Sequence, residues 1–209
     1  MRGIETKVIL ELFDKCINPS LLNNCESWTL SSSEEEQIDK IGVRAIKRLF
    51  SLPTTTPSVA VIFNLGLLYT TQIVDQKRFL YLHKILNLQN NHWNRQMLAH
   101  LQNTNLGWAK NITEKLSEYE LETRWEVIRM KTKGQWREEI RRAINNRNKQ
   151  RLVENCTTIS TSGTKINTKT KEIHTKLTTE PYNRQPPNEM VNGNKQTKIN
   201  NNSDTTWNA

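Results

Sequence analysis

The sequence is poor in glycine, proline and cysteine: its 209 residues include 7 Gly, 6 Pro and 3 Cys. So little Gly and Pro does not suit a chain of many tight turns, which disfavours a β-sandwich, a β-barrel or a glycine-rich nucleotide-binding fold. Cys16, Cys25 and Cys156 are odd in number and form no C-x-x-C pair, so they indicate neither a disulfide framework nor a zinc site. We therefore expect a helical protein of a reducing intracellular compartment, the cytoplasm or the nucleus.

Long apolar runs are also missing. Apolar residues make up 35% of the chain, below the usual value of about 45–50%, and no run approaches the roughly 18 apolar residues of a membrane span. The first residues, MRGIETKVILELF, carry acidic side chains within their apolar stretch and lack the apolar core of about 7–15 residues that a signal peptide has. We expect no association with a membrane.

The chain changes character near residue 156. Residues 156–209 are dominated by Ser, Thr and Asn, and their few apolar residues follow neither a helical nor a strand period. Such a segment buries too little surface to offset its ordering entropy. The sequence therefore predicts a helical domain over residues 1–155 and a disordered polar tail over 156–209, which share the net charge of +9.

Apolar residues at three- and four-residue spacing predict helices in the first part. The first helix runs to Ile17, and Asn18-Pro19 is expected to break it before a short segment that ends near Trp28. A capping box of Ser33 with Glu36 then predicts the start of a helix that ends before residue 53.

The remaining segments extend this pattern. Pro57 predicts the start of a short helix that Gly66 closes. Residues 70–87 are apolar nearly all round, which predicts a helix at the centre of the core. Weaker helical segments follow near 91–103, 112–118 and 121–131, and a last helix is expected over 133–152. The predicted fold class is therefore all-α, an irregular helical bundle with a disordered C-terminal tail.

The helix that precedes residue 53 has two distinct faces. At 100° per residue its apolar side chains share one face, and four cations share the opposite one. Cations so arranged can follow a phosphate backbone, although they also suit a solvated helix surface with no ligand. The apolar residues are Ile38, Ile41, Ala45, Ile46 and Leu49; the cations are Lys40, Arg44, Lys47 and Arg48.

The last predicted helix carries a second group of cations. Arg147 and Arg151 continue its apolar stripe, so we expect the helix to leave the core and become basic there. Together with Arg141 and Arg142 they are candidates to contact nucleic acid, although a basic C-terminus also complements the helix dipole. The tryptophans at 93, 108, 125 and 136 are expected to pack in the core rather than to stack on bases.

Residue patterns typical of catalysis are absent from the sequence. Its four Asp, at 14, 39, 75 and 204, are dispersed, so no pair suggests a two-metal phosphoryl-transfer site. The four His have no metal-ligand spacing, and neither a nucleophile elbow nor a phosphate-binding loop occurs. We expect no enzyme activity, no cofactor, no metal and no small-molecule substrate.

One stretch resembles a known family. Residues 19–29, PSLLNNCESWT, are followed by a helix ending RAIKRLFSLP, a Thr-Pro turn and LGLL. This order resembles the region downstream of the polymerase palm in reverse transcriptases of non-LTR, LINE-like retrotransposons, and weaker similarity continues to about residue 155. Two departures stand out: Asn23-Asn24 occupies the place of the family's Tyr-Gly, and Tyr69 lies near a position where the family usually has Pro.

The resemblance implies a thumb and linker region that grips a primer-template duplex behind the active site. The family's Y-x-D-D motif does not occur in this sequence, so the resemblance implies a chain that is non-catalytic by itself. It also assigns backbone contacts with RNA or DNA to Lys40, Arg44, Lys47 and Arg48. The alternative is a helical adaptor that binds another protein, in which the cations serve only solubility.

Overall fold

The computed structural model describes residues 6–104 and 106–161, and the side chains of this part through residue 155. Helices and turns make up the described chain, and no strand occurs in it. The all-α prediction is confirmed. Most of the predicted tail, from residue 162 onward, lies outside the described residues.

Helix α5 (Thr70–Leu86) forms the centre of the fold, as its apolar character on every side predicts. It contacts α3 (Ser32–Leu49), α6 (Trp93–Thr104), α7 (Gly107–Glu118), α8 (Trp125–Met130) and α9 (Lys133–Thr161). Its Phe79 and Leu82 are fully buried. Because it is surrounded by neighbours, it needs no polar face toward solvent.

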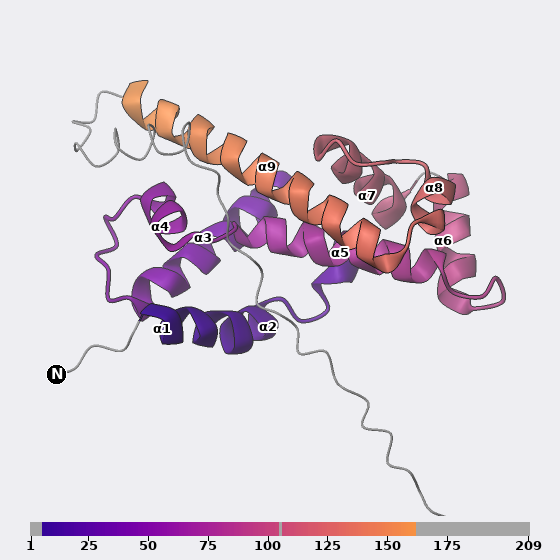
Figure 1. Cartoon of the computed structure of the whole chain (residues 1–209), viewed down its shortest axis with the longest axis horizontal. Coiled ribbons are helices and arrows are strands. Elements are labelled where there is room, and N and C mark those ends of the chain that lie inside the picture. Colours follow the sequence, from indigo (N-terminus) through magenta and orange to yellow (C-terminus); the bar gives the residue numbers. More distant parts are fainter. Residues whose placement is uncertain (1–5, 105, 162–209) are drawn as a thin grey trace, which may run out of the picture.

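A central pair of helices joins two groups of helices. Figure 1 shows α9 lying alongside α5, with α1, α3 and α4 at one end of this pair and α6, α7 and α8 at the other. One apolar cluster joins α5 to α7, α8 and the first half of α9, around Ile112 and Ile140. A second cluster joins α3 and α4 to Phe13 and to Leu152 near the end of α9. The basic helix α3 is therefore anchored in the second cluster.

The N-terminal segment does not break where the sequence predicted. Helix α1 (Thr6–Leu12) continues into a π-helical turn, Phe13–Ile17, and then into α2 (Asn18–Leu21). The backbone of Asn18 stays helical, with φ −57° and ψ −47°. A π turn is a common site of local helix distortion. Here it directly precedes Pro19, which lies in the first turn of α2, where its missing N–H costs little. The predicted break is therefore wrong.

Helix α3 starts with a capping box in a different register from the predicted one. The Ser31 backbone N–H donates to Glu34 Oε2 at 2.8 Å, and the Ser31 hydroxyl donates to the same oxygen at 2.6 Å. The predicted pair, Ser33 with Glu36, is wrong by two positions. Three serines followed by three glutamates offer the S-x-x-E spacing in three registers, so the motif alone does not select one.

Helix α4 (Ser58–Leu65) begins and ends as predicted. Pro57 precedes its first turn, and Gly66 ends it in the left-handed conformation with φ 61°. A left-handed residue suits glycine because the missing Cβ removes the steric penalty.

Helix α9 remains in the core to a later point than expected. Asn148 is fully buried and donates from Nδ2 to the Leu67 carbonyl at 3.3 Å, and Leu152 is 1% exposed. The prediction that the helix leaves the core at Arg147 is wrong, because Ile144, Asn148 and Leu152 recur every four residues and continue one buried face. The helix continues to Thr161, beyond its predicted end at Leu152.

Three of the four tryptophans expected in the core are buried or half-buried. Trp136 is fully buried and donates from its indole N–H to the Phe79 carbonyl at 3.0 Å, whereas Trp108 donates to Glu26 O at 2.9 Å. Trp125 is 4% exposed. Trp93 lies at the start of α6 and is 71% exposed, so the expectation is wrong for this residue.

Candidate nucleic-acid interface

Helix α3 has a buried face and an exposed basic face. Asp39, Gly42, Val43 and Ile46 are buried, and they pack toward α4 and α5. The predicted apolar face is displaced around the helix, because Ile41 is 46% exposed. Asp39 and Gly42 take part in the buried face through specific contacts rather than through apolar character.

Gly42 and Asp39 define how α3 is held. A Cβ placed on Gly42 would lie 1.9 Å from Thr70 Oγ1, so only glycine fits against the start of α5 without rearrangement. Asp39 accepts hydrogen bonds from the backbone N–H of Thr71 at 2.9 Å and from its hydroxyl at 3.1 Å. These contacts turn the opposite side of α3 toward solvent.

The four cations predicted on α3 differ in their partners. Arg44 and Arg48 are exposed, and neither side chain has a hydrogen bond or ion pair with a described residue. Lys40 pairs with Glu36 at 2.7 Å, and its hydrogen bond lowers the pKa of that carboxyl. Lys47 donates to the Thr54 carbonyl at 3.1 Å. Two of the four charges are therefore uncompensated.

A tight turn follows the basic end of α3. Ser51 has φ 51°, the Leu52 N–H donates to the Lys47 carbonyl at 2.8 Å, and Thr56 N donates to Pro53 O at 3.0 Å. The bond from Lys47 to Thr54 ties this turn to the helix. The threonines of this turn therefore lie beside the basic face, where their hydroxyls can donate to phosphate oxygens.

On α9, the predicted arginines are engaged by carboxylates of the chain. Arg141 and Arg142 share Glu138, at 2.7 and 3.1 Å, and the hydrogen bond from Arg141 lowers the pKa of that carboxyl. Arg147 pairs with Glu118 at 3.3 Å. Burial alone would raise the pKa of Glu118, but Lys115 and Arg147 together lower it. These three arginines are engaged by carboxylates, although Arg141 and Arg142 share the single negative charge of Glu138.

Arg151 has a structural role instead of an exposed one. Its guanidinium lies 2.6 Å from Asp39 Oδ2 and 3.2 Å from Thr71 Oγ1, and its Cζ lies 3.9 Å from the centre of the Tyr69 ring. It therefore neutralises the buried Asp39 and joins α9 to α3 and α5. The expectation that Arg151 belongs to an exposed basic surface is wrong.

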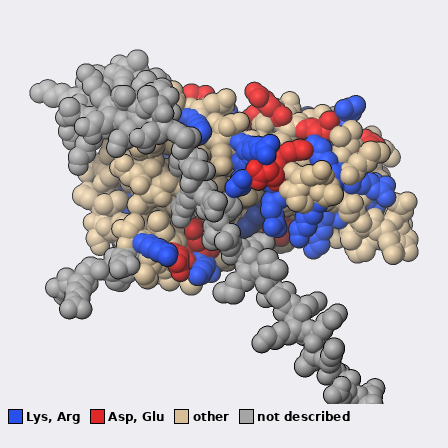
Figure 2. Space-filling view, viewed as in Figure 1, with Lys and Arg blue, Asp and Glu red and all other residues tan. Residues whose placement is uncertain are grey.

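Acidic residues accompany most of the visible cations. In the view of Figure 2, Lys and Arg gather mainly toward the end that holds α7 and α8, and Asp and Glu lie among them. Alternating charges of this kind weaken attraction for a polyanion. The unpaired arginines of α3 thus differ from most cations on this face.

No sequence pattern pointed to another pair of arginines. Arg95 on α6 and Arg129 on α8 line one cavity together with Trp125. They are far apart in the chain and belong to no motif, so only the packing of α6 and α8 brings them together.

The described part of the chain contains no group of three or more His, Cys, Asp or Glu residues arranged to hold a metal ion. No single helix within the described ranges is long and apolar enough to cross a membrane, and α4 and α5 meet that test only as a pair bent by 56°. No family model, no curated protein and no solved structure matches the chain.

Proposed function

We propose that the chain binds the phosphate backbone of RNA or DNA through the exposed face of α3, without sequence preference and without catalysis by the chain itself. The observation that carries this proposal is the pair Arg44 and Arg48. They lie one turn apart, exposed and without a partner among the described residues. Guanidinium groups match phosphate geometry and form charge-assisted hydrogen bonds with it.

The neighbours of this pair extend the same surface. Lys40 is one turn before Arg44 and meets only an exposed carboxylate, and an exposed pair of this kind is worth little in water. Lys47 uses one donor for Thr54 and keeps its charge. The face therefore presents up to four cations along one helix, which suits consecutive phosphates more than a single anion.

Local backbone geometry supports the resemblance to the thumb and linker of retrotransposon reverse transcriptases. Asn24, at the place where that family has Gly, is in the left-handed conformation with φ 56°. Tyr69, near the family's Pro, has φ −64° and ψ 149°, values that proline adopts readily. The two departures from the family's pattern thus keep the backbone conformations that the family's residues favour.

The proposal assigns the arginines and lysines of this face to phosphate groups rather than to base edges. Phosphate contacts position a protein on nucleic acid but carry no sequence information. We therefore expect duplexes of unrelated sequence to bind with affinities within about a factor of two at equal salt, with log K falling against log salt at a slope of about −3 to −4 for four contacts. Fluorescence anisotropy with labelled duplexes measures both. A strong preference for one sequence, or a slope near zero, would contradict the proposal.

The non-catalytic part of the proposal has its own assay. Primer extension and strand cleavage with Mg²⁺ or Mn²⁺ should stay at background, because metal-assisted phosphoryl transfer needs juxtaposed carboxylates. Activity that co-purifies with the chain through successive columns would overturn this part.

A helical adaptor for another protein is the alternative proposal. It is favoured by three exposed apolar side chains, Trp93 and Met97 on α6 and Met130 on α8, which are 71%, 44% and 84% exposed. Such an adaptor need not bind duplex at all. If the chain does not bind duplex at about 50 mM salt, where contacts with the phosphate backbone are strong, the result favours the adaptor proposal.

A further inference from the structure

A cavity lies between the end of α5 and helices α6 and α8, apart from the basic face of α3. Its volume is about 360 Å³, and its walls come from Asn87, Arg95, Gln102, Trp125, Glu126, Arg129 and Met130. This volume is at the lower end of the range of about 300–1,000 Å³ that is typical of small-molecule sites. The cavity is large enough for more than a single inorganic ion.

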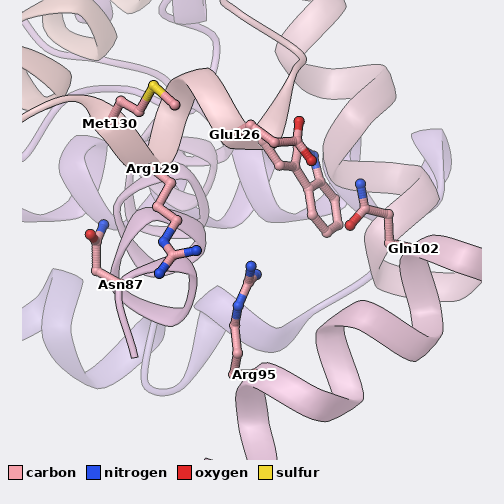
Figure 3. Close-up of a pocket in the computed structure, with 7 residues that line it drawn as sticks. Asn87, Arg95, Gln102, Glu126, Arg129 and Met130 are labelled. Carbon is pink, nitrogen blue, oxygen red and sulfur yellow. The ribbon is translucent and has the colours of Figure 1, made fainter. Parts of the chain in front are cut away.

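Two arginines and one carboxylate, Glu126, line this cavity, and the carboxylate forms no ion pair with either arginine. Figure 3 shows the side chains of Arg95 and Arg129 reaching into the space between α6 and α8 from different sides. Neither guanidinium has a hydrogen bond or ion pair with a described residue. Two like charges that share a partly enclosed space repel each other, so an anion placed between them is favoured.

A third donor in the wall has no partner among the described residues, and its nitrogen is not enclosed. Trp125 is 4% exposed, yet it lines the cavity, and its indole N–H donates to no described residue. A buried tryptophan N–H usually has an acceptor. Trp108 and Trp136 each donate from the indole to a backbone carbonyl, whereas the N–H of Trp125 has no such acceptor. A ligand with acceptor oxygens would satisfy the indole of Trp125.

The remaining wall suits an organic body attached to that anion. The ring of Trp125 and the thioether of Met130 provide apolar surface, and Gln102 and Glu126 provide an amide and a carboxylate in the same wall. A carboxylate accepts from an exocyclic amino group such as cytosine N4. The combination of an anion site, an apolar wall and a carboxylate acceptor matches a nucleotide more closely than a free phosphate ion.

We propose that this cavity binds a nucleoside monophosphate unit, with the phosphate between Arg95 and Arg129 and the base near Trp125 and Glu126. The unit can be a free nucleotide or the 5′-terminal nucleotide of a strand, which share the same phosphate monoester. The site is independent of the α3 face, so either can fail without the other.

Calorimetry on the full chain tests the site with CMP, cytidine and inorganic phosphate as probes. CMP should bind at least tenfold more tightly than cytidine or inorganic phosphate. Arg95→Gln and Arg129→Gln should each weaken CMP binding about tenfold, because each removes a charge-assisted contact. Lys15→Gln, an exposed cation outside both sites, should leave CMP binding unchanged, and circular dichroism verifies that each variant keeps its helices.

A second experiment identifies the source of the nucleotide. This experiment uses the double variant Arg44→Gln, Arg48→Gln. If it binds a 5′-phosphorylated oligonucleotide more tightly than the 5′-hydroxyl form, the result supports a strand end as the ligand. If it binds the two oligonucleotides equally and still binds CMP, the result supports a free nucleotide. Equal affinity for CMP and cytidine, inorganic phosphate binding as well as CMP, or no effect of either arginine variant would overturn the proposal. Tighter binding of a phosphoserine peptide than of CMP would also overturn it.

Discussion

Gly42 is the point at which the packing of α3 can be tested most sharply. An alanine Cβ at this position would lie 1.9 Å from Thr70 Oγ1 and 3.2 Å from Thr70 Cβ, and Thr70 is itself buried at the start of α5. In an open helix, Gly→Ala stabilises by up to about 1 kcal/mol. Here we expect Gly42→Ala to destabilise by about 1–2 kcal/mol, because overpacking typically costs about 1–3 kcal/mol and exceeds the gain in helix propensity.

Two further variants separate the steric effect from helix propensity. Gly134→Ala, in the first turn of α9, meets nothing within 4 Å and should be neutral or stabilising by up to about 1 kcal/mol. Adding Thr70→Ala to Gly42→Ala removes the closest atom, so the pair should show favourable coupling of at least about 1 kcal/mol. Urea unfolding of the wild type, of Gly42→Ala, Thr70→Ala and Gly134→Ala, and of the double variant gives the five free energies that these comparisons need. If Gly42→Ala stabilises the chain as much as Gly134→Ala does, α3 and α5 do not approach as described.

Two further predictions concern buried charges. Burial raises the pKa of Asp75 from 3.8 to about 6. Between these two pH values the folded state keeps a proton on this carboxyl that the unfolded state has lost. The unfolding free energy of the wild type, relative to that of Asp75→Asn, should therefore be highest near pH 4 and should fall by up to about 3 kcal/mol as the pH rises to about 6. A difference that stays constant over this range would refute the raised pKa of Asp75. Arg151→Met should destabilise by about 2–4 kcal/mol in urea unfolding at pH 7, because it leaves the buried Asp39 without its counter-charge. Arg142→Gln on the same helix should change stability by less than about 0.5 kcal/mol, and equal losses in the two variants would contradict the structural role of Arg151.

Apolar periodicity and caps predicted most of the helices from the sequence. The all-round apolar character of 70–87 identified α5 as the centre, and Pro57 with Gly66 identified the limits of α4. Periodicity succeeds there because burial of apolar side chains sets both elements. The capping box of α3 was misplaced, since repeated Ser and Glu leave its register degenerate.

Polar residues in the core account for the main errors. Asp39, Asn148 and Arg151 look like surface residues in the sequence, yet they hold α3, α5 and α9 together through hydrogen bonds and an ion pair. Such partners come from distant parts of the chain, so no local pattern reveals them. The same applies to the cavity between α6 and α8, whose two arginines are brought together only by tertiary packing.

The core also contains a charged network that the sequence did not indicate. Arg78, 1% exposed, pairs with Asp75 at 3.3 Å, and Tyr119 donates to Asp75 at 3.0 Å. Burial raises the pKa of Tyr119, so this hydroxyl stays a donor. The network joins α5 to the end of α7 and shows why α5 tolerates charged residues at buried positions.

The salt dependence of duplex binding, compared between two double variants, tests the proposed function most directly. Replacing Arg44 and Arg48 by Gln should flatten the slope of log K against log salt by about two units between about 50 and 200 mM salt, with helicity unchanged. The matched control, Arg141→Gln with Arg142→Gln, should flatten the slope by clearly less than the α3 double variant does, because both side chains already engage Glu138. Equal effects of the two double variants would show that the binding is only diffuse attraction between nucleic acid and a chain of charge +9. A wild type that fails to bind duplex at about 50 mM salt would contradict the nucleic-acid proposal itself.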